Sequence, residues 1–234
     1  MTEVVIEHRF RGPPDSANGG YACAMAAQFV EGPAEATLRA PAPLERPLSV
    51  DRAAGAVRLC DGETVVVEAN AAAVDVDVPA PVTVDEAREA AAHCTWLDDH
   101  LYPTCFVCGP DRTAGDGLRI FPGPVEGREL YAAPWVPDES LADPTGRVRP
   151  EFAWAVLDCP SGIVTDLLGE VGVILLGRLG ADLRRPLLAG ATYVAMAWPI
   201  GREGRKLDTG SAILSEDGEL HAVARARWIE LRPS

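Results

Sequence analysis

The same order of expected elements occurs twice in this 234-residue sequence, and this repetition constrains the fold more than any other feature. In each half, a polar loop leads into an apolar stretch, and several strand-like runs follow. In the first half, residues 21–30 are rich in Ala, Met and Gln, which favour helix. Consecutive strands after one helix predict an antiparallel sheet with the helix packed on one face. We therefore expect an α+β fold.

Hairpin signals indicate where neighbouring strands meet. Asp61-Gly62 and Asp217-Gly218 each lie between two strand-like runs, and Asp-Gly is a strong signal for a tight hairpin turn. The strands expected in the first half are 34–40, 48–60 with an internal turn, and 64–69. The second half is expected to contain a helix at 152–157 and strands at 118–121, 129–135, 171–176, 192–198, 207–214 and 219–231.

A proline-interrupted segment separates the two halves. Pro79 and Pro81 end the strand pattern, and Thr83 with Glu86 forms a capping-box pattern that predicts a short alanine-rich helix over 85–93. We read this segment as a connector. The expected organisation is an N-terminal module at 1–80, a connector at 81–103 and a C-terminal module at 104–234.

Composition and charge exclude several classes of function. The formal net charge is −14 at pH 7, and so acidic a chain repels phosphate backbones, which argues against a nucleic-acid partner. The longest apolar runs fall far short of the roughly 18 residues that a membrane span needs. The N-terminal residues include acidic side chains and lack an apolar signal core. We expect a cytoplasmic protein with no membrane partner.

The cysteines raise the question of a metal. Cys105-x-x-Cys108 has half of a common zinc spacing, but no second CxxC or HxxxH pair follows it. Cys94, His93 and His100 would complete a ligand set only through a folded-back loop. We expect reduced thiols packed in the interior or in a loop, and we assign no metal and no cofactor.

Several segments resemble one family when they are taken in order. Residues 105–110 (CFVCGP), followed by 117–120 (GLRI), are similar to the segment that opens many PaaI-like thioesterase domains, and 204–228 resembles the final hairpin of such domains. In the first half, 18–20 (NGG) stands where the family commonly has His-Gly-Gly, and 38–41 (LRAP) resembles the following strand end. The set is similar to the hotdog-fold acyl-CoA thioesterase superfamily in its double-hotdog form, which implies two modules that each cradle one helix in a curved sheet.

The resemblance implies thioester cleavage without a serine nucleophile. The sequence has no GxSxG, HExxH or Walker motif. The hotdog chemistry instead uses backbone N–H groups at a helix start and one carboxylate. Gly19 and Gly20 open the first helix, so their amides are candidates for the oxyanion hole, with Asn18 orienting substrate or water. The alternative is an ordinary loop with an asparagine cap.

The acid expected by this resemblance lies nine residues after the histidine of His-Gly-Gly. Counted from Asn18, that position is Ala27, which has no acid–base chemistry. Counted from Arg149, it is Asp158, which follows an apolar run where an unpaired carboxylate is expensive. Asp158 is thus the candidate nucleophile or general base. The alternative is a solvent-exposed Asp at a helix end, since Pro160 stands two residues later.

The second helix start departs from the family pattern, because Arg149-Pro150-Glu151 replaces His-Gly-Gly and the proline removes one N–H group. Glu151 shares a helix face with Asp158 and is a secondary, substrate-binding candidate, although an acid in a first turn often only compensates the helix dipole. We therefore expect a single composite site per chain, which pairs Gly19 and Gly20 with Asp158. The mirror-image pairing of Pro150 with Ala27 would be inactive.

The function expected from these features is hydrolysis of an acyl-CoA or acyl-carrier thioester. Arg202, Arg205 and Lys206 would contact a coenzyme A phosphate, or would form a solvated hairpin tip. The alternatives are a hotdog enoyl-CoA hydratase or dehydratase and a non-catalytic acyl-CoA-binding or scaffold protein. A homodimer of double hotdogs is a further possible assembly.

Overall fold

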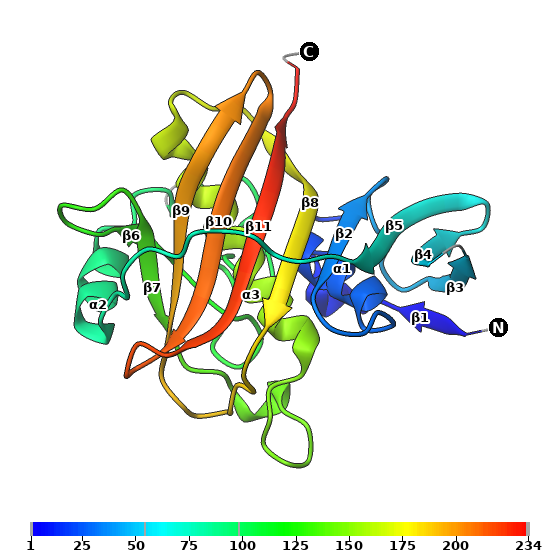
Figure 1. Cartoon of the computed structure of the whole chain (residues 1–234), viewed down its shortest axis with the longest axis horizontal. Coiled ribbons are helices and arrows are strands. Elements are labelled where there is room, and N and C mark those ends of the chain that lie inside the picture. Colours follow the sequence, from blue (N-terminus) through cyan, green and yellow to red (C-terminus); the bar gives the residue numbers. More distant parts are fainter. Residues whose placement is uncertain (1, 54, 98, 233–234) are drawn as a thin grey trace.

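Two similar halves make up the structure, a computed structural model that describes residues 2–53, 55–97 and 99–232 (Figure 1). Each half packs one helix against antiparallel strands, and α2 (Val84–Ala92) lies between the halves in the chain. The first half contains β1 (Glu3–Val5), α1 (Gly19–Ala27), β2 (Ala34–Leu38), β3 (Pro47–Ala53), β4 (Ala56–Asp61) and β5 (Thr64–Ala71). The second half contains β6 (Gly123–Pro124), β7 (Tyr131–Trp135), α3 (Pro150–Ile163), β8 (Ile174–Leu183), β9 (Tyr193–Glu203), β10 (Lys206–Ser215) and β11 (Leu220–Glu230).

The strand order is the same in both halves. Within the described residues, eleven strands form one sheet in the order β1-β3-β4-β5-β2-β8-β11-β10-β9-β7-β6. The first half therefore has the order β1-β3-β4-β5-β2, with α1 following β1. The second half repeats this connectivity as β7-β9-β10-β11-β8, with α3 following β7. The predicted α+β class and the duplicated helix-on-sheet module are confirmed.

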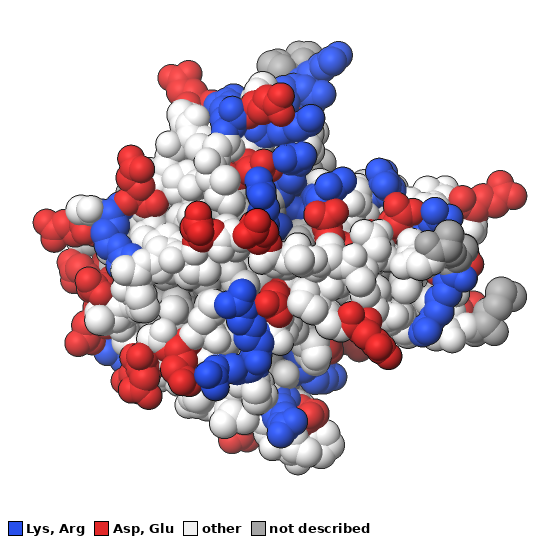
Figure 2. Space-filling model, viewed as in Figure 1, with Lys and Arg blue, Asp and Glu red and all other residues white. Residues whose placement is uncertain are grey.

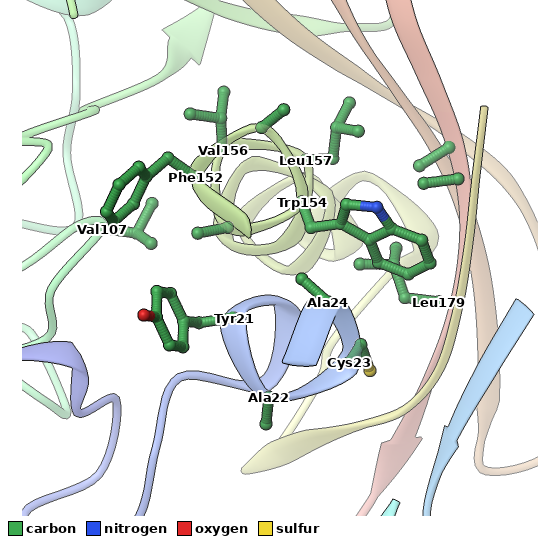
Figure 3. Packing of buried hydrophobic residues seen from close by; sticks show 14 of the residues in the cluster. Tyr21, Ala22, Cys23, Ala24, Val107, Phe152, Trp154, Val156, Leu157 and Leu179 are labelled. Carbon is green, nitrogen blue, oxygen red and sulfur yellow. The ribbon is translucent and has the colours of Figure 1, made fainter. Parts of the chain in front are cut away.

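The equivalent strands β2 and β8 join the halves. They pair antiparallel, with Ala34 opposite Ala181 and Thr37 opposite Arg178. This seam makes the two sheets continuous, and it places both helices on the same side of the sheet, where α1 packs against α3. Figure 3 shows the contact: Tyr21 of α1 and Phe152 of α3 lie at the same end of the helix pair, with ring centroids 5.9 Å apart. Trp154 extends toward Leu179 of β8.

The turn and cap signals of the sequence have their expected conformations. Gly62 and Gly218 have positive φ angles of 60° and 79° in the β4–β5 and β10–β11 hairpins. Thr83 caps α2, because its side chain accepts the Glu86 N–H while the Glu86 carboxylate accepts the Thr83 N–H. Both halves of the capping box are thus formed.

The strand expected at 118–121 is wrong. This segment pairs with the CxxC loop instead of the sheet: the N–H groups of Leu118 and Ile120 donate to the carbonyls of Phe106 and Val107 at 2.8 and 2.9 Å. Arg119 between them has a φ of 53°, a left-handed conformation that interrupts a strand. The alternation of apolar residues here therefore reflects packing against a loop.

The segment after β5 covers the other face of the second half. In Figure 1 it crosses β8–β11 on the side away from α3 before it reaches α2. Three valines at alternate positions, Val74, Val76 and Val78, pack against a buried cluster that includes Met196 and Leu214. Basic and acidic side chains are interspersed on this face (Figure 2). Among the described residues, no helix is long and apolar enough to cross a lipid bilayer.

Candidate active site between the two helices

The first helix begins at an asparagine cap. Asn18 has a non-helical backbone, with φ −56° and ψ 135°, and its Oδ1 accepts the Tyr21 N–H at 2.9 Å. This bond satisfies one of the N–H groups that a helix start leaves unpaired. The same side chain is only 2% exposed, so its amide nitrogen needs a partner inside the protein.

That partner is Asp158 in the middle of α3. The Asn18 Nδ2 donates to Asp158 Oδ2 at 2.8 Å, and the Gly20 N–H donates to the same oxygen at 2.7 Å. The structure thus brings together Asn18, Gly20 and Asp158, which the sequence separates by about 140 positions. Asp158 is 2% exposed, so it is not a solvent-exposed residue at a helix end.

The second carboxylate oxygen of Asp158 has a different environment. Asp158 Oδ1 has no hydrogen-bond partner within the described residues, although it is buried. Burial raises the pKa of Asp158 to about 7, and the negative charge of Cys105 acts in the same direction. The hydrogen bonds from Gly20 and Asn18 favour the ionised carboxylate and oppose this rise. One oxygen therefore has two hydrogen-bond donors, whereas the other has none within the described residues.

Gly20 is the residue that permits this close approach. A Cβ atom at position 20 would lie 2.5 Å from the Trp154 carbonyl oxygen and 2.5 Å from Asp158 Cβ. No larger residue fits there unless α1 and α3 move apart. A glycine in a first helical turn costs conformational entropy. Here it allows the backbone N–H of one half to reach the carboxylate of the other.

Gly19 has a different environment. Within the described residues its N–H makes no hydrogen bond, although it belongs to the first turn of α1. A Cβ atom there would meet the side chains of Leu176 at 2.9 Å and Leu38 at 3.3 Å. Two leucine side chains thus lie against this glycine.

The backbone of α3 around Asp158 is fixed by side chains that the sequence analysis did not identify. Ser211 of β10 donates to the Leu157 carbonyl at 2.7 Å. Ser161 donates to the Asp158 carbonyl at 2.6 Å and accepts the Trp228 indole N–H at 3.0 Å. The helix runs through Pro160 to Ile163, so the proline does not end it near Asp158. The contact of Ser211 with α3 could not be predicted, because no local pattern marks a strand serine that hydrogen-bonds to a helix.

The remaining candidate residues lie elsewhere. Glu151 is in the first turn of α3, where its Oε1 is 3.4 Å from Arg149 Nε. At the β9–β10 hairpin, Arg202 pairs with Glu230 at 2.7 Å and Arg205 donates to the Glu230 carbonyl at 3.0 Å. Lys206 is exposed. Within the described residues, no hydrogen bond or ion pair joins any of these four to Asp158.

Three cysteines offer a set of possible metal ligands beside Asp158. Cys105, Cys108 and Cys159 are close in space, with their sulfur atoms all within 4.8 Å of one another. Cys159 lies on α3, about fifty positions from the other two, so no spacing in the sequence indicates that it joins them. Among the described residues, all six cysteines are free thiols.

The duplicated module, with one helix packed on each antiparallel half-sheet, is the arrangement of the double-hotdog class of fold. No protein-family model and no curated protein matches the sequence. In structure, the chain is similar to the tesB protein of Mycobacterium avium subspecies paratuberculosis, with a TM-score of 0.59 and 11% identity, over 94% of this chain and 90% of that one. At this identity the likeness shows the fold alone, and it confirms the predicted double hotdog.

Two further solved structures match about half of the chain. A thioesterase from Haemophilus influenzae has a TM-score of 0.46 and 21% identity over 53% of this chain and 85% of its own. The Escherichia coli PaaI protein from the phenylacetic acid degradation operon has a TM-score of 0.46 and 11% identity over 53% of this chain and 88% of its own.

Proposed function

We propose that this protein hydrolyses acyl thioesters, with Asp158 as the general base. The observation that carries the proposal is that the two oxygens of one buried carboxylate differ in their hydrogen bonding. Oδ2 is held by Asn18 and Gly20, whereas Oδ1 has no partner within the described residues. A fixed carboxylate with one free oxygen and a pKa of about 7 is suited to accept a proton near neutral pH.

The proposed reaction uses a water molecule as the nucleophile. Asp158 Oδ1 removes a proton from the water, whose oxygen attacks the thioester carbonyl carbon. The C–S bond then breaks, and the leaving thiolate takes the proton from Asp158, which restores the carboxylate. Asn18 is a positioning residue in this scheme, since its amide orients the carboxylate and does not touch the reacting atoms.

The Gly19 N–H is the proposed donor to the developing oxyanion. The Gly20 N–H is already bound to Asp158, and the Tyr21 N–H is bound to Asn18. Gly19 therefore has the free first-turn amide within the described residues, at the positive end of the helix dipole. The loss of one such donor costs about 2.7–4 kcal/mol of transition-state stabilisation in other enzymes.

The apolar surroundings of Gly19 favour an acyl group as the part of the substrate that enters. Leu38 and Leu176 lie against this glycine, so a hydrocarbon chain would find contacts there. Because Asp158 is almost fully enclosed, packed side chains around it must shift for a thioester to reach it. Lys206 stays the simplest candidate for a coenzyme A phosphate, since Arg202 is paired with Glu230.

The test is release of free thiol from a panel of acyl-CoAs by the wild type and by Asp158→Asn. We expect the variant to lose about 100-fold or more in kcat/KM, because general-base catalysis typically contributes 10²–10⁴-fold. Asp182→Asn is the matched control: Asp182 lies on β8 and pairs with Arg184 at 2.9 Å. Full activity in Asp158→Asn would discard the assignment.

A second candidate is binding of acyl-CoA without turnover. It is favoured by the enclosure of Asp158 and by the use of the Gly20 N–H within the protein. Tight binding of an acyl-CoA with no thiol release by the wild type would support this candidate. Hydration of an enoyl-CoA without thiol release would indicate the hydratase instead, although no histidine of the described residues hydrogen-bonds to Asp158.

A further inference from the structure

Three cysteines from two distant segments converge at one point. Cys105 and Cys108 lie on the loop that follows the connector, and Cys159 lies on α3. The sulfur atoms of Cys105 and Cys159 are 3.7 Å apart, and all three lie within 4.8 Å of one another. A disulfide has an S–S bond of about 2.05 Å, so these are separate thiols around a common centre.

We propose that Cys105, Cys108 and Cys159 bind a zinc ion. Zinc prefers tetrahedral thiolate and imidazole ligands at Zn–S distances of about 2.3 Å, which places neighbouring sulfurs about 3.8 Å apart. The 3.7 Å separation of Cys105 and Cys159 matches that spacing. Three sulfurs leave one tetrahedral position, which we assign to water or another small ligand.

Each of the three sulfurs also faces an N–H donor. His100 Nε2 is 3.3 Å from Cys108 Sγ, and Asn18 Nδ2 is 3.5 Å from Cys159 Sγ. The backbone N–H groups of Val107 and Cys108 face the Cys105 sulfur. Such outer-shell donors stabilise the negative charge of metal-bound thiolates.

His100 acts in this site as a donor and not as a ligand. Its Nδ1 accepts the Tyr102 N–H at 2.9 Å, so the proton of the neutral ring is on Nε2, which faces Cys108. A zinc ligand would need a lone pair on Nε2. His100 therefore keeps its proton toward Cys108 Sγ, and the three thiols alone would bind the metal, as thiolates.

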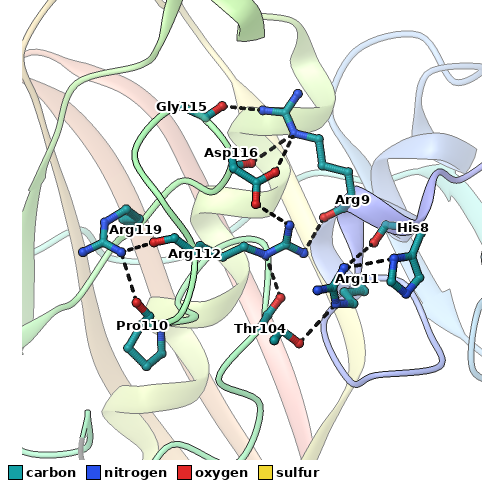
Figure 4. Close-up of polar contacts among 9 residues, drawn as sticks. All are labelled: His8, Arg9, Arg11, Thr104, Pro110, Arg112, Gly115, Asp116 and Arg119. Atoms are coloured by element: carbon teal, nitrogen blue, oxygen red, sulfur yellow. Dashed lines mark hydrogen bonds and ion pairs between the residues drawn. The ribbon is translucent and has the colours of Figure 1, made fainter.

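The loop that carries Cys105 and Cys108 is held in place without a metal (Figure 4). Arg112 is 6% exposed, and its guanidinium donates to the Thr104 and Arg9 carbonyls at 2.8 and 2.7 Å and pairs with Asp116 at 2.8 Å. The Gly109 N–H closes the CxxC turn on the Cys105 carbonyl at 2.9 Å. A preformed loop reduces the ordering that metal binding must otherwise supply.

The experiment is metal analysis of the full chain together with a cobalt titration. We expect one zinc per chain after incubation with zinc and gel filtration, and a thiolate-to-cobalt charge-transfer band that saturates at one equivalent of Co²⁺. Cys105→Ser and Cys159→Ser should each weaken Co²⁺ binding roughly 10-fold or more, as the loss of a thiolate ligand predicts. Cys60→Ser is the control, because Cys60 lies on β4, outside the cluster.

Several results would overturn the proposal. A wild-type protein that retains less than roughly a tenth of an equivalent of zinc, or whose Co²⁺ complex lacks the charge-transfer band, has no such site. A disulfide among the three cysteines in reduced, freshly prepared protein would have the same meaning, as would equal weakening by Cys60→Ser. If Cys159→Ser does not fold, Cys108→Ser and the wild-type titration decide. None of these readouts depends on hydrolase activity.

Discussion

The N–H of Gly20 and the carboxylate of Asp158 form a 2.7 Å hydrogen bond across 138 positions of the chain. The bond joins the two modules at a point where both residues are buried. Hydrogen bonds to an ionised partner are shorter and stronger than neutral ones, so this contact ties the start of α1 to the middle of α3.

Gly20→Ala should destabilise the protein and lower the activity together. The added methyl group would lie 2.5 Å from the backbone oxygen of Trp154, which cannot rotate away. We expect a loss of about 1–3 kcal/mol in the free energy of unfolding, as for other overpacked sites. Gly201→Ala is the control in denaturant titrations, since a Cβ at position 201 meets nothing within 4 Å. An unchanged midpoint in Gly20→Ala would contradict the close packing of the helices.

Two substitutions of Asn18 separate its cap from its contact with Asp158. Asn18→Ala removes both the bond to the Tyr21 N–H and the bond to Asp158, and it should cost about 1 kcal/mol of stability for the cap alone. Asn18→Ser keeps a capping oxygen but has no amide donor. We expect Asn18→Ser to recover stability in thermal melts while kcat stays low in both variants. Recovery of kcat in Asn18→Ser would show that the amide does not position the carboxylate.

The Asp208–Arg227 pair predicts a pH dependence of stability. Two bonds of 2.7 Å from Arg227, with Arg225 nearby, lower the pKa of Asp208. A carboxylate whose pKa is lowered by folding stabilises the protein above its unfolded pKa and loses this effect as the pH falls through its folded pKa. Asp208→Asn should therefore cost about 0.5–1 kcal/mol at pH 7, as partly exposed pairs do. In urea titrations the difference should shrink below roughly pH 4, whereas a constant difference would mean that packing is responsible.

Zinc should raise the melting temperature of the wild type. A ligand at 100 times its Kd stabilises the folded state by about 2.7 kcal/mol, and each kcal/mol shifts Tm by about 2–4 °C in a domain of this size. We expect no such shift in Cys105→Ser, because one of the three ligands is gone. Differential scanning fluorimetry with and without a chelator makes the comparison. An equal shift in the variant would assign the effect to another site.

Much of the fold could be predicted because its signals are local. The Asp-Gly turns at 61–62 and 217–218 and the capping box at Thr83 depend on residues within a few positions of one another. The strand at 118–121 was wrong for a physical reason: its apolar residues bury against the CxxC loop, and nothing local shows the left-handed backbone at Arg119. β1 was missed because three residues give too short a pattern.

The candidate site was predictable only in part. The count from the helix starts indicated Gly20 and Asp158, and the structure brings them together. The use of the Gly20 N–H by the carboxylate itself could not be foreseen, since it depends on the exact distance between α1 and α3. Cys159 was missed for a similar reason: its partners are contributed by a loop fifty residues earlier. Contacts between residues that are far apart in the chain produce no periodic pattern in the sequence.

Because β2 and β8 join the two halves within one chain, the halves can accept amino-acid substitutions independently. In a symmetric assembly of identical chains, every substitution appears at two related places at once. Here the seam joins two segments of a single polypeptide, so a change on one side is not copied on the other. One half thus contributes the glycine helix start at Gly20, and the other contributes the acid at Asp158, without either half having to serve both purposes.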